Sequence, residues 1–270
     1  LRHRDSPDEE PIPYIDLWAR SDLLNHLHRQ FGHFGEKTML DLLRTRGWWP
    51  TRRKDCRYFI RHCPECQLAQ KPRDVHRDEM HPSHEWNSRT QPFERWGLDL
   101  IGPLPKTHVG NRWIITAIDY ATGWPEAEAI PEAKAEVIAD FLRTRIYKQY
   151  GAPKEVITDK GANLWAPAME QAFDDLRAKH RGTTIYHPRT NGMVERLNGI
   201  LGAILTKYLI GQSIKHWDKY LDQALFATRI RTHSSKGTSP FYLLYGVHPH
   251  LVGDESGPTP DSLSELERED

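Results

Sequence analysis

Residues 96–103 are WGLDLIGP, and the first strand of the predicted sheet lies in this stretch. Its alternation predicts a β-strand in which Asp99 points to the face opposite Leu98 and Leu100. A strand of this kind can present its carboxylate beside groups from neighbouring elements. Asp99 is therefore a candidate functional residue.

The chain around this strand carries further strand and helix signals. The sequence predicts strands over 96–101, 113–119, 127–130, 155–158 and 183–186. It predicts helices over 135–150, 166–179, 192–209 and 216–232. Strands in a meander followed by β-α-β units indicate an α/β fold, a mixed sheet with helices packed on it.

The composition bounds the class of protein. A chain of 270 residues suggests one large domain or two smaller ones, and 38% hydrophobic residues against 27% charged residues support a buried core. No apolar run approaches the roughly 20 residues of a membrane helix, and the polar start lacks a signal-peptide pattern, so a membrane protein is not expected. Three clustered cysteines, Cys56, Cys63 and Cys66, indicate a reducing compartment rather than a disulfide scaffold.

Charge is unevenly distributed along the chain. The totals balance at 37 basic and 37 acidic residues. Residues 1–19 hold five acids and two arginines, and residues 251–270 hold seven acids and one arginine, which leaves 34 basic and 25 acidic residues between them, a surplus of nine positive charges. A basic body suits a polyanion such as nucleic acid. The alternative is that acidic ends only keep a neutral protein soluble.

The chain is expected to divide into five segments. These are a flexible acidic lead over 1–20, a small helical domain over 21–71, a linker over 72–91, a larger domain over 92–250 and a disordered acidic tail over 251–270. In the small domain Ser21 is expected to begin the first helix, and Gly47 to end the second. A domain this small has little core of its own and usually needs an additional cross-link, such as a bound metal ion.

Four residues of the small domain have the spacing of a metal site. Four residues separate His28 from His33, and two separate Cys63 from Cys66. Two thiolates and two imidazoles suit a tetrahedral Zn²⁺, whose binding energy would stabilise the domain. The alternatives are two surface histidines and a redox Cys-x-x-Cys pair, which normally has a βαβ context that is lacking here. Cys56 is expected to pack in the third helix.

Three carboxylates lie where strands and a helix can present them together. Asp159 follows the fourth predicted strand, Glu195 lies in the first turns of the long helix, and 35 residues separate the two. With Asp99 they offer the oxygen ligands that Mg²⁺ prefers, and two such ions can stabilise both oxygens of a phosphoryl displacement. Taken singly, each acid more often faces solvent. Asp119, on another strand, is expected only to brace the turn before Gly123.

These features together resemble the integrases of Ty3/Gypsy-type long-terminal-repeat retrotransposons, which are related to retroviral integrases. The matching features are the His-His-Cys-Cys set with WWP at 48–50 and CPECQ at 63–67, the Asp, Asp, 35 residues, Glu signature, IDYATGW at 118–124, the run 187–198 and TSPFYLLYG at 238–246. The resemblance covers about residues 21–250. It implies an RNase H-like mixed sheet flanked by helices and preceded by a small helical zinc-binding domain. It also implies that Asp99, Asp159 and Glu195 are catalytic and hold two Mg²⁺ or Mn²⁺ ions, while His28, His33, Cys63 and Cys66 hold one structural Zn²⁺.

The resemblance also implies an activity. An activated water would trim each 3′ end of double-stranded element DNA, and the freed 3′-hydroxyl would attack target DNA. The implied partners are element ends, target DNA, further copies of the chain in a homo-multimer, and chromatin. The implied location is the nucleus, after a stage in cytoplasmic virus-like particles.

DNA contacts are expected on two surfaces. The candidates are Arg189, Asn191, Arg196 and Asn198 around Glu195, and Arg52, Arg53 and Lys54 on the small domain. The alternative is that Asn191 caps the long helix and Arg196 points to solvent. Gly199 and Gly202 lie on a helical face where relatives are expected to offer basic or polar side chains.

Rival functions remain open at this point. Family members usually carry a small basic barrel after the core, whereas this chain ends in an acidic tail, so it is either truncated or derived from an element that has decayed or been co-opted by its host. A co-opted form would be a non-catalytic, zinc-dependent DNA- or protein-binding module. A DNA-cutting transposase of the same fold is disfavoured by the zinc domain ahead of the core.

Overall fold

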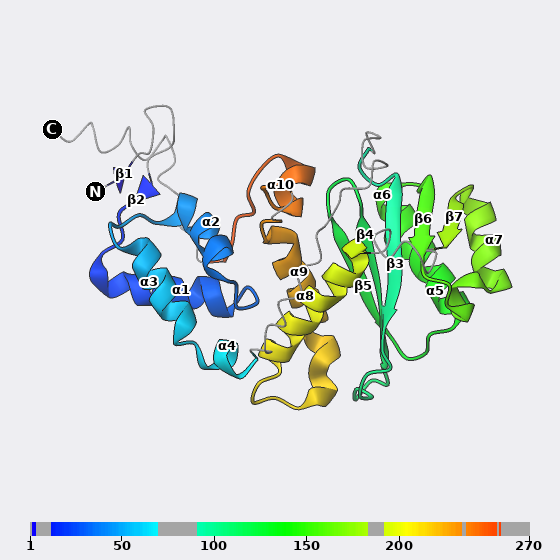
Figure 1. Ribbon diagram of the computed structural model, residues 1–270, viewed down its shortest axis with the longest axis horizontal. Coiled ribbons are helices and arrows are strands. Elements are labelled where there is room, and N and C mark those ends of the chain that lie inside the picture. The colour runs from blue at the N-terminus through cyan, green and yellow to red at the C-terminus, as the bar shows by residue number, and fades with distance from the viewer. Residues whose placement is uncertain are drawn as a thin grey trace, which may run out of the picture.

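The computed structural model describes residues 2–3, 12–69, 91–182, 192–233, 236–252 and 254 (Figure 1). A helical N-terminal module lies at one end of the molecule, a β-sheet at the other, and helices α8 and α9 between them. No helix in the described part of the chain is long and apolar enough to cross a membrane.

In the described part of the chain, the N-terminal module has four helices and a short ribbon. The helices are α1 (Leu17–Arg29), α2 (Glu36–Arg46), α3 (Arg52–Arg61) and α4 (Pro64–Leu68), and the ribbon pairs β1 (Arg2–His3) with β2 (Ile12–Pro13). Leu27, Met39, Leu43 and Trp49 are fully buried among them. Gly47 ends α2 as predicted, and its N–H bonds to the Leu43 carbonyl at 3.1 Å.

The first helix begins earlier than predicted. It starts at Leu17, with Asp16 as the extended residue before it, rather than at Ser21. The preceding segment is held against the module because Ile15 N–H bonds to the Trp48 carbonyl at 3.1 Å. The prediction of a flexible lead through residue 20 is therefore wrong from residue 12 onward. Residues 4–11, like the linker residues 70–90, lie outside the described part.

The second part of the chain forms the predicted mixed sheet. Its strands are β3 (Arg95–Ile101), β4 (Trp113–Asp119), β5 (Pro125–Ile130), β6 (Glu155–Thr158) and β7 (Lys179–Gly182), in the spatial order β5-β4-β3-β6-β7. β3, β4 and β5 pair antiparallel, whereas β6 and β7 continue the sheet in parallel with β3. This is the RNase H-like mixed sheet that the resemblance implied.

The last strand lies earlier in the sequence than predicted. It was expected over 183–186, which are outside the described residues, and the structure has it at Lys179–Gly182. The preceding helix α7 (Pro167–Leu176) stops before its expected end at residue 179 because Arg177 takes a left-handed conformation, φ 51°. The chain then turns directly into pairing with β6.

Helices cover both faces of the sheet (Figure 1). On one face α5 (Ala135–Phe141), which continues through the π-helical η2 (Leu142–Tyr147) into α6 (Lys148–Tyr150), packs with α7 over Leu98 and Ile115. On the other face α8 (Gly192–Tyr208) and α9 (Leu221–Ile230) pack over Ile114 and Ile118. The described residues also form two short 3-10 helices, η3 (Ala162–Trp165) and η5 (Ile214–Tyr220), and the helix α10 (Pro240–Tyr245).

The helix predicted over 216–232 is two elements, η5 followed by α9. Ser213 starts η5 because its Oγ accepts the N–H of Lys215 at 3.3 Å. Trp217 then anchors η5 by donating its Nε1–H to the Pro105 carbonyl at 2.8 Å. The chain continues into α9, which ends at Ile230.

The N-terminal module packs on α8 and α9 through one continuous apolar core. Leu24, Leu27 and Phe31 share this core with Ile204 and Ala227. The segment that starts the predicted tail also lies in it, since Leu251 is 2% exposed. The prediction of a disordered tail is therefore wrong for residues 251, 252 and 254, and residues 255–270 are outside the described part.

Candidate metal centres

The first centre brings together the two histidines and two cysteines singled out in the sequence. His28 lies in the last turn of α1, His33 in the following loop, and Cys63 and Cys66 at the start of α4 and within it. One ligand atom from each lies within 4.8 Å of all the others. Cys63 Sγ is 3.3 Å from His33 Nδ1, and Cys66 Sγ is 3.3 Å from His28 Nε2 and 3.8 Å from His33 Nδ1.

The loop between the histidines is shaped by unusual backbone angles. Gly32 has φ 90° and His33 has φ 53°. The His33 N–H bonds back to the His28 carbonyl at 2.8 Å, which turns the two rings toward each other. A side chain at residue 32 would meet Ile204 at 3.1 Å and Ala227 at 3.2 Å, so glycine allows the close approach of α8 and α9.

These four residues fit zinc in distance and in chemistry. With Zn–S of about 2.3 Å and Zn–N of about 2.0 Å, tetrahedral angles put sulfur and nitrogen about 3.5 Å apart, which the observed separations bracket. Burial lowers the pKa of both His28 and His33 to about 4, so both imidazoles are neutral at pH 7, as ligands must be. Burial raises the pKa of Cys63 to about 12, and a bound cation would reverse this shift by favouring the thiolate.

The third cysteine has a different environment. Cys56 lies in α3 and is fully buried, and burial raises the pKa of its thiol to about 12. It packs in the apolar core of the N-terminal module, as its position in the third helix predicted.

The second centre begins with two carboxylates at equivalent positions of neighbouring strands. β3 and β6 are parallel, and Gly97 pairs with Ile157. Asp99 lies two residues beyond Gly97, and Asp159 lies two residues beyond Ile157, directly after β6. Because paired strands lie about 4.8 Å apart, this register puts both residues at the same level of the sheet.

Helix α8 carries the third carboxylate, Glu195, and is hydrogen-bonded to the first, Asp99. Asn198 donates its Nδ2–H to Oδ2 of Asp99 at 2.8 Å and accepts the Thr116 hydroxyl at 2.7 Å. Glu195 lies three residues before Asn198 and therefore on the same side of the helix. Asp99 thus points to the face that bears α8, opposite Leu98, as the alternation predicted.

The charges of the other two carboxylates act on Asp99, although among the described residues only the His-His-Cys-Cys set has its ligand atoms gathered as they would be around an ion. Burial raises the pKa of Asp99, and the negative charges of Asp159 and Glu195 raise it further, against the hydrogen bonds from Leu100 N–H and Asn198. A divalent cation held among the carboxylates would relieve this repulsion. Hard oxygen ligands from two strands and a helix can hold Mg²⁺ and leave positions open for phosphate.

The neighbouring strand carboxylate has a structural role. Asp119 is fully buried and accepts both the N–H and the hydroxyl of Thr122, at 2.8 and 2.6 Å. It also accepts the N–H of Phe93 at 3.0 Å. Asp119 therefore braces the turn before Gly123, as predicted.

The contacts of the candidate residues with DNA stay predictions, and the structure shows the protein contacts that they make. The amide of Asn198 bonds to Asp99 and Thr116 and has a second Nδ2–H, so a DNA contact stays open to it. Arg196 and Lys54 are exposed. Arg53 pairs with Glu36 at 3.2 Å on the surface, and Arg52 donates to the Gly47 carbonyl at 3.5 Å. Arg189 and Asn191 lie outside the described residues.

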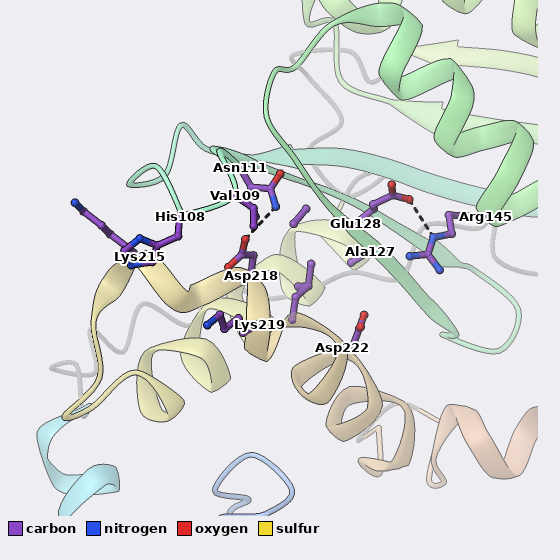
Figure 2. A pocket seen from close by; sticks show the side chains of 12 residues that line it. His108, Val109, Asn111, Ala127, Glu128, Arg145, Lys215, Asp218, Lys219 and Asp222 are labelled. Carbon is purple, nitrogen blue, oxygen red and sulfur yellow. Dashed lines mark hydrogen bonds and ion pairs between the residues drawn. The ribbon is translucent and has the colours of Figure 1, made fainter.

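A separate cavity of about 290 Å³ lies between β5, η5, α9 and the loop at residues 108–111 (Figure 2). Asn111 donates to Asp218 at 3.0 Å, and Arg145 pairs with Glu128 at 3.0 Å, so much of its polar lining is already satisfied. Its lining includes no residue of either centre.

Comparison with known proteins identifies two integrase domains in the chain. Residues 18–72 match the integrase zinc binding domain, and residues 89–188 match the integrase core domain. The chain is 29% identical over 243 residues to the Pro-Pol polyprotein of simian foamy virus type 3 (strain LK3), covering 89% of this chain and 20% of that one. It is 26% identical over 234 residues to the Gag-Pol polyprotein of feline leukemia virus, covering 86% and 13%.

The chain thus spans about a fifth of the length of the first of these relatives. Among solved structures it is similar to the HTLV-2 integrase catalytic core domain in complex with magnesium (trimeric form), with a TM-score of 0.44, 21% identity, and coverage of 56% of this chain and 95% of that one. The four clustered histidines and cysteines fall within the zinc-binding match, and Asp99 and Asp159 within the core match. With its helical His-His-Cys-Cys module ahead of an integrase core, the chain belongs to the retroviral integrase superfamily.

Proposed function

We propose that this chain is a retrotransposon integrase of the Ty3/Gypsy type that trims the 3′ ends of double-stranded element DNA and joins them to target DNA. The observation that supports the proposal is the register of β3 and β6, which puts Asp99 and Asp159 at the same level of the sheet, together with the bond from Asn198 to Asp99, which ties α8 and its Glu195 to this edge. The basic surplus of residues 20–250 supports a polyanionic substrate.

The carboxylates have distinct roles in this proposal. Asp99 and Asp159 would hold Mg²⁺ or Mn²⁺ from neighbouring strands, with Glu195 completing the set from the helix side. Two such ions supply charge stabilisation for the attacking and leaving oxygens of an in-line displacement. Asn198 keeps Asp99 oriented toward α8 through the 2.8 Å bond, and this bond favours the ionised carboxylate that a cation requires.

The N-terminal module would serve this activity through one structural Zn²⁺ bound by His28, His33, Cys63 and Cys66. The integrase zinc-binding match and the clustering of the four ligand atoms support this assignment. We further propose that the chain acts as a homo-multimer holding two DNA ends, on chromosomal DNA in the nucleus and in contact with chromatin, after a stage in cytoplasmic virus-like particles.

A strand-joining assay tests the proposal. The zinc-loaded chain is incubated with a pre-trimmed double-stranded donor end and target DNA, in Mg²⁺ and separately in Mn²⁺. Joined product is expected, and Asp159→Asn should abolish it while leaving DNA binding intact. Asp140→Asn is the matched control because Asp140 is an exposed carboxylate on α5, remote in sequence from the three acids.

The outcomes separate the alternatives. DNA binding without any joined product would favour the non-catalytic binding module. Joined product from the Asp159→Asn protein would refute the assignment of the site.

A further inference from the structure

Trp165 lies beside the carboxylate centre and has a contact that its sequence position does not reveal. It is the last residue of η3 and is 40% exposed. Its indole Nε1–H donates to the backbone carbonyl of Asp159 at 2.9 Å. The indole N–H, which is the one polar group of this side chain, therefore bonds to the backbone of a proposed metal ligand.

Trp165 is held in place by an aromatic stack. The His180 ring, on β7, lies between two aromatic rings, Trp165 at 4.1 Å and Phe173 at 4.3 Å between centroids, with interplanar angles of 29° and 27°. Phe173 is buried in α7 and anchors the stack in the core. A side chain on Gly182 would lie 2.6 Å from the indole Cζ2, so the edge strand has glycine where the indole passes.

The Thr158 hydroxyl is a second donor to the Asp159 carbonyl, and it also contacts His180. The Thr158 hydroxyl donates to the Asp159 carbonyl at 2.8 Å, and Thr158 Oγ1 is 2.8 Å from His180 Nε2. Because that hydroxyl has only one hydrogen, His180 must donate its Nε2–H to Thr158. Burial lowers the pKa of His180 to about 4, so the ring is neutral at pH 7 and can hold its proton on that nitrogen.

These contacts restrain a residue that the sheet itself does not hold. Asp159 is exposed and follows the last residue of β6. Its Oδ1 accepts the Gly161 N–H at 3.0 Å. With the carbonyl held by two donors and Oδ1 by a third, the direction in which the carboxylate leaves the sheet is fixed before any cation binds.

We propose that Trp165 is a positioning residue for Asp159, fixing its backbone carbonyl from the aromatic stack so that the carboxylate is preorganised for a divalent cation. This inference rests on the proposed function of the carboxylate centre. It predicts that loss of the indole N–H weakens cation binding rather than the fold.

The test compares variants that separate the N–H from the ring. Trp165→Phe keeps an aromatic ring on His180 and removes the donor, and Trp18→Phe is the matched control because Trp18 is 79% exposed on α1. The Mg²⁺ concentration for half-maximal strand joining should rise about threefold to tenfold in Trp165→Phe, the effect of losing one hydrogen bond. Turnover at saturating Mg²⁺ should change by less than about twofold.

A second pair of variants tests the same carbonyl from the other side. Thr158→Val removes the hydroxyl in a buried position and should raise the Mg²⁺ requirement in the same direction, whereas Thr158→Ser should restore it. These variants keep the inference testable even if Trp165→Phe does not fold.

Binding of Mn²⁺ to the zinc-loaded chain of 270 residues, measured by electron paramagnetic resonance without DNA, gives a readout independent of catalysis. A weaker affinity in Trp165→Phe supports the positioning role even if the wild-type protein joins no DNA, a result that would count against the proposed function alone. Equal metal requirements in Trp165→Phe, Trp18→Phe and the wild type would overturn the inference, as would a loss of turnover with unchanged metal affinity.

Discussion

Replacing Arg46 with alanine is expected to weaken the packing of the N-terminal module on the rest of the chain. Arg46, at the end of α2, forms a two-point ion pair with Asp254, with distances of 2.5 and 2.8 Å, and donates to the Pro249 carbonyl at 2.7 Å. The two side chains are 10% and 15% exposed. The pair is therefore largely desolvated and connects two segments more than 200 residues apart in the sequence.

The expected cost follows from what the substitution leaves behind. Removing one partner of a buried ion pair typically costs about 3–5 kcal/mol. Asp254 keeps the Leu251 N–H, at 2.7 Å, as a donor, and its carboxylate can turn toward water, so we expect about 2–3 kcal/mol here. At roughly 2–4 °C per kcal/mol for a domain of this size, the Tm should fall by about 4–12 °C.

Thermal unfolding followed by circular dichroism measures this effect, with Arg44→Ala as the control because Arg44 is exposed on the same helix. Burial raises the pKa of Asp254, but the Arg46 and Leu251 hydrogen bonds outweigh it and hold the pKa below the ordinary 3.8. A depressed folded-state pKa gives stability that is present above the unfolded pKa and lost as the pH falls through the folded one. The difference between Arg46→Ala and wild type should therefore stay constant between about pH 5 and 7 and shrink below about pH 4. Equal Tm values for Arg46→Ala and Arg44→Ala at pH 7 would refute this reasoning.

Three further substitutions test other parts of the structure. Cys63→Ser should lose the bound zinc, measured by metal analysis, and lower the Tm of the N-terminal module; a variant that melts as the wild type does would contradict a structural zinc. Asn198→Ala removes a hydrogen bond that lowers the pKa of Asp99. The acid limb of the pH profile of strand joining in Mg²⁺ should therefore move to higher pH. An acid limb at the wild-type pH would count against a role of this hydrogen bond in ionising Asp99. Arg229→Ala removes the guanidinium that donates to the buried Glu126 carboxylate at 2.7 Å. The free energy of unfolding, measured in urea, should fall by about 2–4 kcal/mol. An unchanged urea midpoint would show that this ion pair does not stabilise the fold.

Local patterns were enough to predict most of the elements and the candidate ligands. The alternation around Asp99 predicted the strand that contains it and the face of the sheet to which it points, because the side-chain period of a strand does not depend on the rest of the chain. Gly47 predicted the end of α2, because glycine commonly follows the last turn of a helix. The spacing of the His-His-Cys-Cys set predicted the cluster because the chemistry of zinc restricts which residues can meet.

The remaining features depend on contacts that a sequence does not display. The position of β7 follows from the left-handed Arg177, a conformation that most residues other than glycine rarely take. The amide of Asn198 meets Asp99 across 99 residues, and Arg46 meets Asp254 across 208. Such pairs arise from how the helices pack on the sheet, which local sequence patterns do not reveal.

Helix α8 physically connects the two candidate metal centres. Its 17 residues span about 25 Å, and near its start Asn198 donates to Asp99, with Glu195 three residues earlier on the helix. Near its end Lys207 donates to the backbone carbonyl of His33 at 3.1 Å, directly beside a proposed zinc ligand. Because zinc would fix the loop that carries His33, it would also fix the surface on which the C-terminal half of α8 rests. In the proposed function, a zinc ion bound there would orient the same helix that presents the third carboxylate, and so would support the carboxylate centre without taking part in its chemistry.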